Sequence, residues 1–208
     1  MDKGALLTAE LPHLTDCGLP GISRIPYGLH ACHFYPDRQR LVEALVPYFL
    51  AGLRNNERCL WVAAPPLDAN DARRALEAAA GAERVADVID SGALRIFDFD
   101  EWYASASGLN GLDVLRHWLG EEEQALAAGY SGLRITGNTS FLQPGDWATF
   151  MEYERAVSEG FAGRRIVALC SYPLASRSPQ EVGEVMHTHE CTFDRPDANW
   201  QVVARPLR

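Results

Sequence analysis

The chain has 208 residues and a formal net charge of −9, and 47% of its residues are hydrophobic. This length supports a substantial core in one large domain or two small ones. The negative charge, spread along the chain, disfavours direct binding to nucleic acid, which requires a basic surface. No apolar run approaches the roughly 18–20 residues that cross a bilayer, so we expect no membrane association. Five cysteines at irregular spacings indicate a reducing compartment and predict a cytoplasmic protein.

Taken in chain order, the sequence begins with residues 1–26, which contain prolines and glycines without a clear period and predict an irregular N-terminal arm. Beyond the arm, strands and helices alternate. The predicted strands lie at 29–35, 58–64, 94–98, 132–136 and 165–171, and the predicted helices at 38–53, 70–80, 112–128, 146–161 and 179–187. Residues 192–193 and 200–203 are predicted to form a terminal hairpin or an edge strand.

The alternation predicts the fold class. Near-continuous apolar strands separated by helices are typical of a mostly parallel sheet that is covered on both faces. No repeat, low-complexity tract or linker interrupts the pattern. The sequence therefore predicts an α/β, three-layer αβα fold, with residues 27–208 forming one domain behind the arm.

The loop after the first strand lacks the features that bind phosphate. In a nucleotide-hydrolysing α/β domain this loop is rich in glycine and ends in Lys-Ser/Thr. Here it reads Tyr35-Pro36-Asp37-Arg38, with a proline that has no N–H to donate and a carboxylate that repels phosphate. These residues favour a sensor over a nucleotide-driven motor.

Aromatic and polar residues gather where the predicted strands end. Ligands of open α/β sheets bind beyond the carboxyl ends of the strands. Aromatic walls with a few hydroxyl and amide groups suit a small, mostly apolar molecule with one polar group. The alternative is that these aromatic side chains only complete the core. The candidate residues are Tyr35, Trp102, Tyr103, Asn138, Ser140, Ser171 and Tyr172.

Several short segments, in this order, resemble the MEDS family, the methanogen/methylotroph sensory domain named after a dichloromethane-responsive repressor. The matching segments run from about residue 26 to the region of His187. They are Gly28-Leu29-His30-Ala31-Cys32-His33-Phe34-Tyr35, the stretch from Gly52 to Val62, Trp102-Tyr103, Gly129-Tyr130-Ser131-Gly132-Leu133-Arg134 with Gly137-Asn138, Tyr153-Glu154, and Ala168-Leu169-Cys170-Ser171-Tyr172.

The resemblance implies a RecA/KaiC-like ATPase fold with a degenerate phosphate loop. It also implies sensing of small, hydrocarbon-derived molecules and signalling to an output module in transcription regulation. The resemblance accounts for His30 and Cys32, which join the candidate ligand-binding residues. The strand at 132–136 leads into Asn138, where such ATPases place the carboxylate that organises magnesium and water, so we expect no ATP hydrolysis.

Histidines and cysteines form two clusters that suggest an alternative, a metal site. On a strand, His30 and Cys32 share one face while His33 points to the other. His187 and Cys191 share a face whether their segment is extended or helical. Imidazole and thiolate suit zinc, copper or iron, so His30, Cys32, His187 and Cys191 are the candidate ligands.

An enzyme is the remaining alternative. Cys32 or Cys170 with a nearby histidine could provide a thiol nucleophile. A thiol inside an apolar strand, such as Cys170, is usually an inert small hydrophobic group, however. The acidic cluster Asp98, Asp100 and Glu101 could serve acid/base chemistry but is more typical of a solvated strand exit.

The leading prediction is a non-catalytic sensory domain that needs no cofactor. It would bind a small organic ligand and signal to a separate regulatory protein acting in trans. Ligand binding shifts an equilibrium only through its difference in affinity for the two states. We therefore expect the pocket to adjoin moving loops, for which 98–111 and 138–145 are the candidates. The sequence leaves the ligand, the partner and the oligomeric state open.

Overall fold

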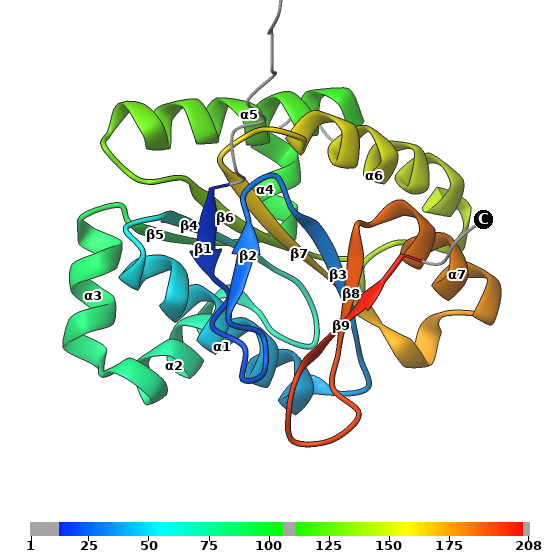
Figure 1. Cartoon of the computed structure of the whole chain (residues 1–208), viewed down its shortest axis with the longest axis horizontal. Helices are drawn as coiled ribbons and strands as arrows, with labels where there is room; N and C mark the ends of the chain where they lie inside the picture. Colours follow the sequence, from blue (N-terminus) through cyan, green and yellow to red (C-terminus); the bar gives the residue numbers. More distant parts are fainter. Residues whose placement is uncertain (1–12, 106–110, 206–208) are drawn as a thin grey trace, which may run out of the picture.

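The computed structural model describes residues 13–105 and 111–205. Within them lies a seven-stranded sheet with the spatial order β5-β4-β6-β7-β3-β8-β9 (Figure 1). Neighbouring strands are parallel, except that β9 pairs antiparallel with β8. The strands are β3 (His30–Tyr35), β4 (Arg58–Ala63), β5 (Leu94–Asp98), β6 (Leu133–Asn138), β7 (Ile166–Pro173), β8 (Cys191–Asp194) and β9 (Gln201–Ala204).

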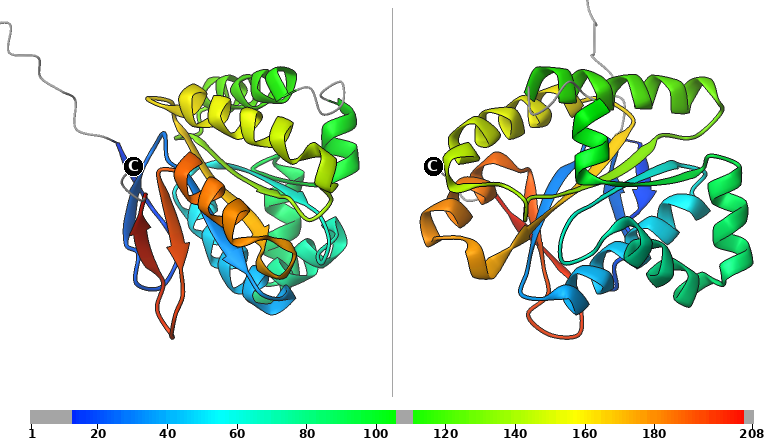
Figure 2. Two further views of the ribbon diagram at one scale, coloured as in Figure 1. Left: turned by 90° about the vertical axis from the view of Figure 1, so that its right-hand side faces the viewer. Right: turned by 180° about the vertical axis from the view of Figure 1, so that it is seen from behind.

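Helices cover both faces of the sheet and complete a three-layer αβα sandwich (Figure 2). On one face lie α1 (Arg38–Arg54), α2 (Ala69–Ala80) and α3 (Ala82–Asp90). On the other lie α4 (Phe99–Ser105), α5 (Gly111–Ala127), α6 (Trp147–Phe161) and α7 (Pro179–Thr188). Short 3₁₀ turns occupy Pro144–Asp146 and Leu174–Ser176. The predicted α/β class with a mostly parallel sheet is confirmed.

Side-chain caps explain where several helices begin. Asp37 accepts a hydrogen bond from the backbone N–H of Arg40 and caps α1, and Asp68 caps α2 through Asp71 N–H. Ser178 and Glu181 form a reciprocal capping box at the start of α7. These short polar residues satisfy N–H groups that have no partner inside the helix.

Two helices were not predicted. Ala82–Asp90 forms α3 directly after Gly81, and Phe99–Ser105 forms α4 directly after β5. The acidic residues Asp100 and Glu101 lie in the first turn of α4, where negative charge stabilises a helix. The segment interpreted as a solvated strand exit is therefore helical as far as residue 105, and residues 106–110 of the predicted moving loop lie outside the described residues.

The N-terminal arm is more regular than predicted. Residues 1–12 lie outside the described residues, but β1 (Leu14–Asp16) and β2 (Arg24–Pro26) form an antiparallel pair. Cys17 and Ile25 are buried in the core formed with α1. The described part of the arm therefore docks on its own chain.

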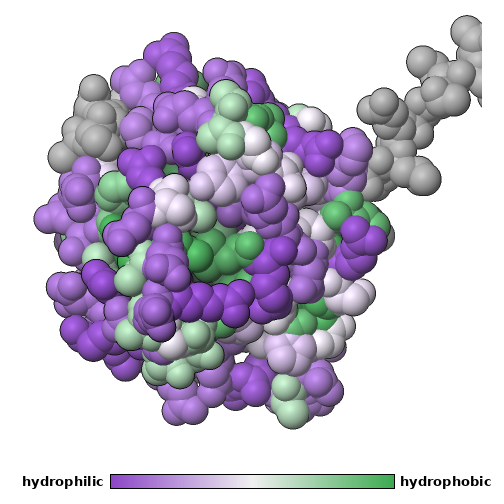
Figure 3. Space-filling view, turned by 90° about the vertical axis from the view of Figure 1, so that its left-hand side faces the viewer, coloured by the Kyte–Doolittle hydropathy of each residue, from purple (hydrophilic) through white to green (hydrophobic). Residues whose placement is uncertain are grey.

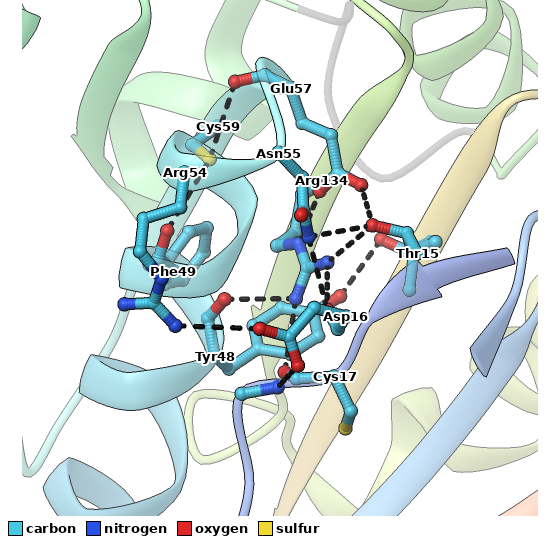
Figure 4. Close-up of polar contacts among 12 residues, drawn as sticks. Thr15, Asp16, Cys17, Tyr48, Phe49, Arg54, Asn55, Glu57, Cys59 and Arg134 are labelled. Carbon is cyan, nitrogen blue, oxygen red and sulfur yellow. Dashed lines mark hydrogen bonds and ion pairs between the residues drawn. The ribbon is translucent and has the colours of Figure 1, made fainter. Parts of the chain in front are cut away.

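Arg134 of β6 attaches this hairpin to the domain (Figure 4). Its Nε lies 2.5 Å from Glu57 Oε2, and neither side chain is exposed to solvent. Its terminal nitrogens donate to the backbone oxygens of Asp16 and Cys17 in the hairpin and of Tyr48 in α1. One buried guanidinium thus joins the hairpin, a helix and the central sheet.

The β5 side of the molecule combines apolar and polar surface. In the view onto this side, hydrophobic surface lies in the middle and hydrophilic surface surrounds it (Figure 3). Ile96 and Phe97 of β5 are only partly buried. None of the described helices is both long and apolar enough to cross a membrane.

Candidate functional site

The turn from β3 into α1 is poorly suited to bind phosphate. Asp37 caps the helix, and its Oδ1 accepts from Arg40 N–H at 2.9 Å. A helix N-terminus attracts phosphate through its free N–H groups and its positive dipole end. Here a carboxylate already uses one of those groups and adds negative charge at the same place.

Polar side chains meet at the carboxyl ends of β3 and β6, on the α1 side of the sheet. Tyr35 Oη donates to Asn138 Oδ1 at 3.0 Å, and Ser140 N–H donates to the same oxygen at 2.9 Å. The amide nitrogen of Asn138 contacts the backbone oxygens of Ala64 and Pro65. Asn138 therefore ties three segments together in the position where the ATPase carboxylate was expected.

The other predicted ligand residues divide between the two faces of the sheet. Ser171 bonds to the His33 ring at 2.7 Å on the α1 side. Tyr172 is buried on the opposite face, where its ring lies against His189. Trp102 stacks on Trp118 within the apolar core and is not among the residues that line the two cavities described below. The predicted set therefore does not form one site.

A small cavity lies between α4, α5 and α6, on the face seen at the right of Figure 2. Its volume is about 110 Å³. An engineered apolar cavity of about 150 Å³ binds benzene, so this volume suits an organic molecule of a few heavy atoms. Of the predicted residues, Tyr103 lines it. The wall consists of Tyr103, Gly111, Val114, Leu142, Asp146, Thr149, Phe150 and Tyr153.

A second, smaller cavity lies next to the first and is lined in part by residues of the sheet. The two share Tyr103, Phe150 and Tyr153, and the smaller one has a volume of about 20 Å³. That is close to the space that one water molecule needs. Glu154 and Cys170 also line the smaller cavity, so polar groups lie next to the aromatic side chains that the two cavities share.

Those groups belong to a buried cluster of four residues, His30 of β3, Glu154 of α6, Cys170 of β7 and His189, which follows α7. Glu154 Oε2 lies 3.1 Å from His30 Nε2 and 3.2 Å from His189 Nε2. His30 Nε2 also lies 3.3 Å from Cys170 Sγ. His30 and His189 are fully buried.

Hydrogen bonds on the far side of each ring fix its orientation and tautomer. Ser158 donates its single hydroxyl proton to Thr188 O at 2.7 Å, so its oxygen must accept from His30 Nδ1 at 2.8 Å. His189 Nδ1 lies 2.9 Å from Val185 O, an oxygen that only accepts. Both rings therefore carry a proton on Nδ1, and both Nε2 atoms face Glu154.

The pKa values of His30 and Glu154 are both lowered, for different reasons. Burial, together with the neighbouring His189, lowers the pKa of His30 to about 4. Burial alone would raise the pKa of Glu154, but its contacts with His189 and His30 lower it to about 2. With its proton on Nδ1, His30 turns the Nε2 lone pair toward Glu154 Oε2, so a cation or a shared proton is needed between these two acceptor atoms.

The four metal ligands predicted from the sequence do not meet. Cys32 Sγ lies 3.3 Å from Thr192 Oγ1. His187 is exposed and its ring bonds to Gly183 O in its own helix. Cys191 belongs to the core on the α1 side, whereas His30 faces α6. Only His30 belongs to the observed cluster.

The other three members of the cluster, Glu154, Cys170 and His189, were not predicted from the sequence to bind a metal. Tyr153-Glu154 is one of the segments that resemble the family, and Cys170 was interpreted as an inert thiol. His189 lies two residues after His187 and was not among the predicted ligands. Strand and helix periodicity place each of them on a face, but neither reveals which distant elements meet.

The thiols are poorly suited to act as nucleophiles. Burial raises the pKa of Cys32 to about 12 and the pKa of Cys170 well above its usual value. A thiol nucleophile reacts as the thiolate, which these environments disfavour. Asp98, a candidate acid or base, accepts a hydrogen bond from Ala69 N–H at the start of α2.

A solved structure has a similar fold. The chain is similar to the crystal structure of a KaiC-like protein from the hyperthermophilic archaeon Pyrococcus horikoshii. The sequence identity is 13%, the match covers 95% of this chain and 90% of that chain, and the TM-score is 0.58. At this identity the similarity supports the RecA/KaiC-like fold alone.

A search of curated proteins finds no match. The sequence model described as "MEthanogen/methylotroph, DcmR Sensory domain" matches residues 29–190, most of the chain. The resemblance noted in the sequence is thereby confirmed, and the chain belongs to the MEDS family of sensory domains.

Proposed function

We propose that this domain senses a small, mostly apolar organic molecule, which binds in the cavity between α4, α5 and α6. The observation that carries the proposal is the mostly apolar cavity itself, which shares the aromatic side chains of Tyr103, Phe150 and Tyr153 with a smaller cavity lined by polar groups. Apolar walls with a few polar groups are typical of small-molecule sites. The volume of about 110 Å³ favours compounds of one to a few carbon atoms.

Filling the cavity tests the proposal. Val114 lines the cavity and is buried, so Val114→Phe places a ring in the space that the ligand would use. Leu126 lies on the same helix but is 41% exposed, so Leu126→Phe is the matched control. Each protein is titrated with xenon, short-chain alcohols and halomethanes, and binding is followed by NMR and by thermal midpoint.

We expect saturable binding of at least one probe to the unmodified protein and to Leu126→Phe. Val114→Phe should bind that probe at least about tenfold more weakly, a change of about 1.4 kcal/mol in binding free energy. Equal binding by Val114→Phe would place the ligand elsewhere, and no binding of any probe would contradict the apolar-ligand proposal.

Signalling is proposed to pass to a separate regulatory protein in the cytoplasm. The five cysteines form no disulfide, which is consistent with a reducing compartment. The ligand must bind two conformations with different affinity if it is to change what the partner recognises. Recovery of a partner from a lysate of the source cells, with and without the probe that binds, tests this step, and identical recovery would count against it.

We further propose that the domain does not hydrolyse ATP. Support comes from Asp37, which caps α1, and from Asn138 at the end of β6. The measurement is phosphate release from Mg-ATP by the purified protein. Release above background that disappears in Asn138→Ala would overturn this expectation.

A further inference from the structure

The buried cluster of His30, Glu154, Cys170 and His189 has the features of a metal site. Their ligand atoms all lie within 4.8 Å of one another. Glu154 Oε2 and His189 Nε2 are buried, and neither has a hydrogen-bond partner of acceptable geometry among the described residues. Buried polar atoms are nearly always satisfied, so two such atoms 3.2 Å apart indicate that a bound group is missing between them.

We propose that His30 Nε2, Glu154 Oε2, Cys170 Sγ and His189 Nε2 bind one divalent transition-metal ion of the zinc type. This inference stands independently of the small-molecule proposal, because it uses the cluster itself and not the cavity beside it. It also replaces the set expected from the sequence, of which only His30 belongs to the cluster.

The distances fit a tetrahedral site. Zinc lies about 2.0–2.3 Å from nitrogen, oxygen and sulfur ligands, so neighbouring ligand atoms in a tetrahedron are about 3.3–3.8 Å apart. Three of the ligand pairs are separated by 3.1, 3.2 and 3.3 Å. Shifts of a few tenths of an ångström therefore suffice to admit the ion.

The two imidazole rings are already held as metal ligands require. Each donates its Nδ1 proton away from the cluster, His30 to Ser158 Oγ and His189 to Val185 O. Ligating histidines usually make such an outer hydrogen bond, which fixes the ring and leaves the Nε2 lone pair free for the metal. The same tautomer would leave the apo cluster with two lone pairs facing a carboxylate.

The charges of the four groups and their ligand chemistry also favour a divalent transition-metal ion. A divalent ion bound to the Glu154 carboxylate and a Cys170 thiolate forms a neutral unit with two neutral imidazoles, and burial of a neutral unit avoids a large desolvation cost. Metal binding would remove the proton from the thiol, as it does in other thiolate sites. Two nitrogens, one sulfur and one oxygen suit zinc or cobalt better than calcium or magnesium.

The ion would lie beside the smaller cavity. Cys170 is only partly buried, and with Glu154 it lines the smaller cavity. Four protein ligands complete a tetrahedral shell, so the ion would be of the structural kind, which has no open coordination position.

The first test is metal content and cobalt binding of the full chain. The protein is purified from zinc-supplemented medium for elemental analysis, and a chelator-treated sample is titrated with Co²⁺. We expect close to one zinc ion per chain. With cobalt we expect the intense visible bands of tetrahedral Co²⁺ and a near-ultraviolet charge-transfer band from a thiolate ligand.

Variants locate the ion. Cys170→Ser, nearly the same size, should lose the charge-transfer band and weaken cobalt binding at least about tenfold, and Glu154→Gln should weaken it similarly. Cys32→Ser and His187→Gln are matched controls, because these residues have the same ligand chemistry but lie outside the cluster. Both controls should keep the stoichiometry and the spectrum of the unmodified protein.

The outcomes separate the proposal from its competitor, a proton held between His189 and Glu154. Metal content well below one ion per chain, with no cobalt bands, would overturn the metal site and leave the small-molecule proposal standing. Loss of cobalt binding in His187→Gln alone would assign the metal to the surface and overturn the proposal. Should a cluster variant fail to fold by circular dichroism, the unmodified protein still decides, because zinc must then raise its thermal midpoint.

Discussion

Arg134 and Glu57 show how much the setting of an ion pair determines its contribution to stability. Their side chains are fully excluded from solvent, and Arg134 also donates to backbone oxygens of the N-terminal hairpin. Removing one partner of a buried pair leaves the other charge desolvated and unpaired, at a cost of about 3–5 kcal/mol. An exposed pair contributes about 0–1 kcal/mol.

We therefore expect Glu57→Gln to lower the free energy of unfolding by about 3–5 kcal/mol, measured by equilibrium urea denaturation. The control is Asp113→Asn in α5, which removes the partner of Arg116, a side chain that is 75% exposed. This control should lose no more than about 0.5 kcal/mol. Equal losses in the two variants would mean that other groups in the core compensate the charge of Arg134 when Glu57 is replaced.

At the residue scale the sequence predicted part of the site. It placed His30 and Tyr103 among the candidates, and both lie in or beside the cavity and its cluster. It also included Trp102, which packs into the core, and omitted Glu154 and His189. The spacing of residues along one strand shows which face of the sheet each side chain occupies. The contact of β3 with α6 and with the end of α7 depends instead on tertiary packing between segments more than 100 residues apart in the sequence.

At the scale of elements, Gly18 determines how closely the N-terminal hairpin approaches α1. Its φ is +86°, and a Cβ placed there would lie 2.3 Å from the backbone oxygen of Pro47. Gly81, between α2 and α3, has a similar φ of +91°, but a Cβ at that position would have nothing within 4 Å. The two glycines therefore separate the cost of backbone strain from the cost of steric overlap.

Gly81→Ala should cost about 1–3 kcal/mol of unfolding free energy, because only its backbone conformation, with φ +91° and ψ 140°, is penalised. Gly18→Ala should cost about 1–3 kcal/mol more, because the methyl group must displace the backbone of α1. Urea denaturation gives both values, and limited proteolysis should cleave Gly18→Ala faster within the hairpin. Equal costs would show that the hairpin moves away without loss of other contacts.

The length and the periodicity of an element determine whether the sequence predicts it. Strands such as 94–98 and the helix at 38–53 carry long apolar patterns, and they agree with β5 and α1 to within a residue. The strands β1 and β2 have three residues each, too few for a period. Only pairing across the hairpin and the contacts of Arg134 make them regular, so the segment reads as irregular in the sequence.

At the scale of the whole molecule, the sheet separates the polar residues into two groups. Apolar strands and intervening helices predicted a parallel sheet, and the rule for its carboxyl ends predicted the region of the site. The register was not predicted. It pairs His30 with Ala168 and His33 with Ser171, and it thereby places the His30 cluster and the His33–Ser171 pair on opposite faces.

Burial of His33 makes the stability of the whole molecule depend on pH. The ring lies against Tyr35 and Trp200 and bonds to Ser171. Burial lowers its pKa from 6.5 to about 3 in the folded protein. Between these values the unfolded chain binds a proton that the folded chain does not, so the free energy of unfolding falls as the pH falls from about 6.5 toward 3.

The expected contribution of His33 is a loss of about 2 kcal/mol between pH 7 and pH 5. Urea denaturation at several pH values, for the unmodified protein and for His33→Gln, isolates this contribution as a difference in slope, whatever the stability of the variant at pH 7. Above pH 7.5 the two curves should run parallel, because His33 is then neutral in both states. Parallel curves down to pH 5 would instead mean that the folded protein accommodates the charged ring, which requires water or a carboxylate to reach His33.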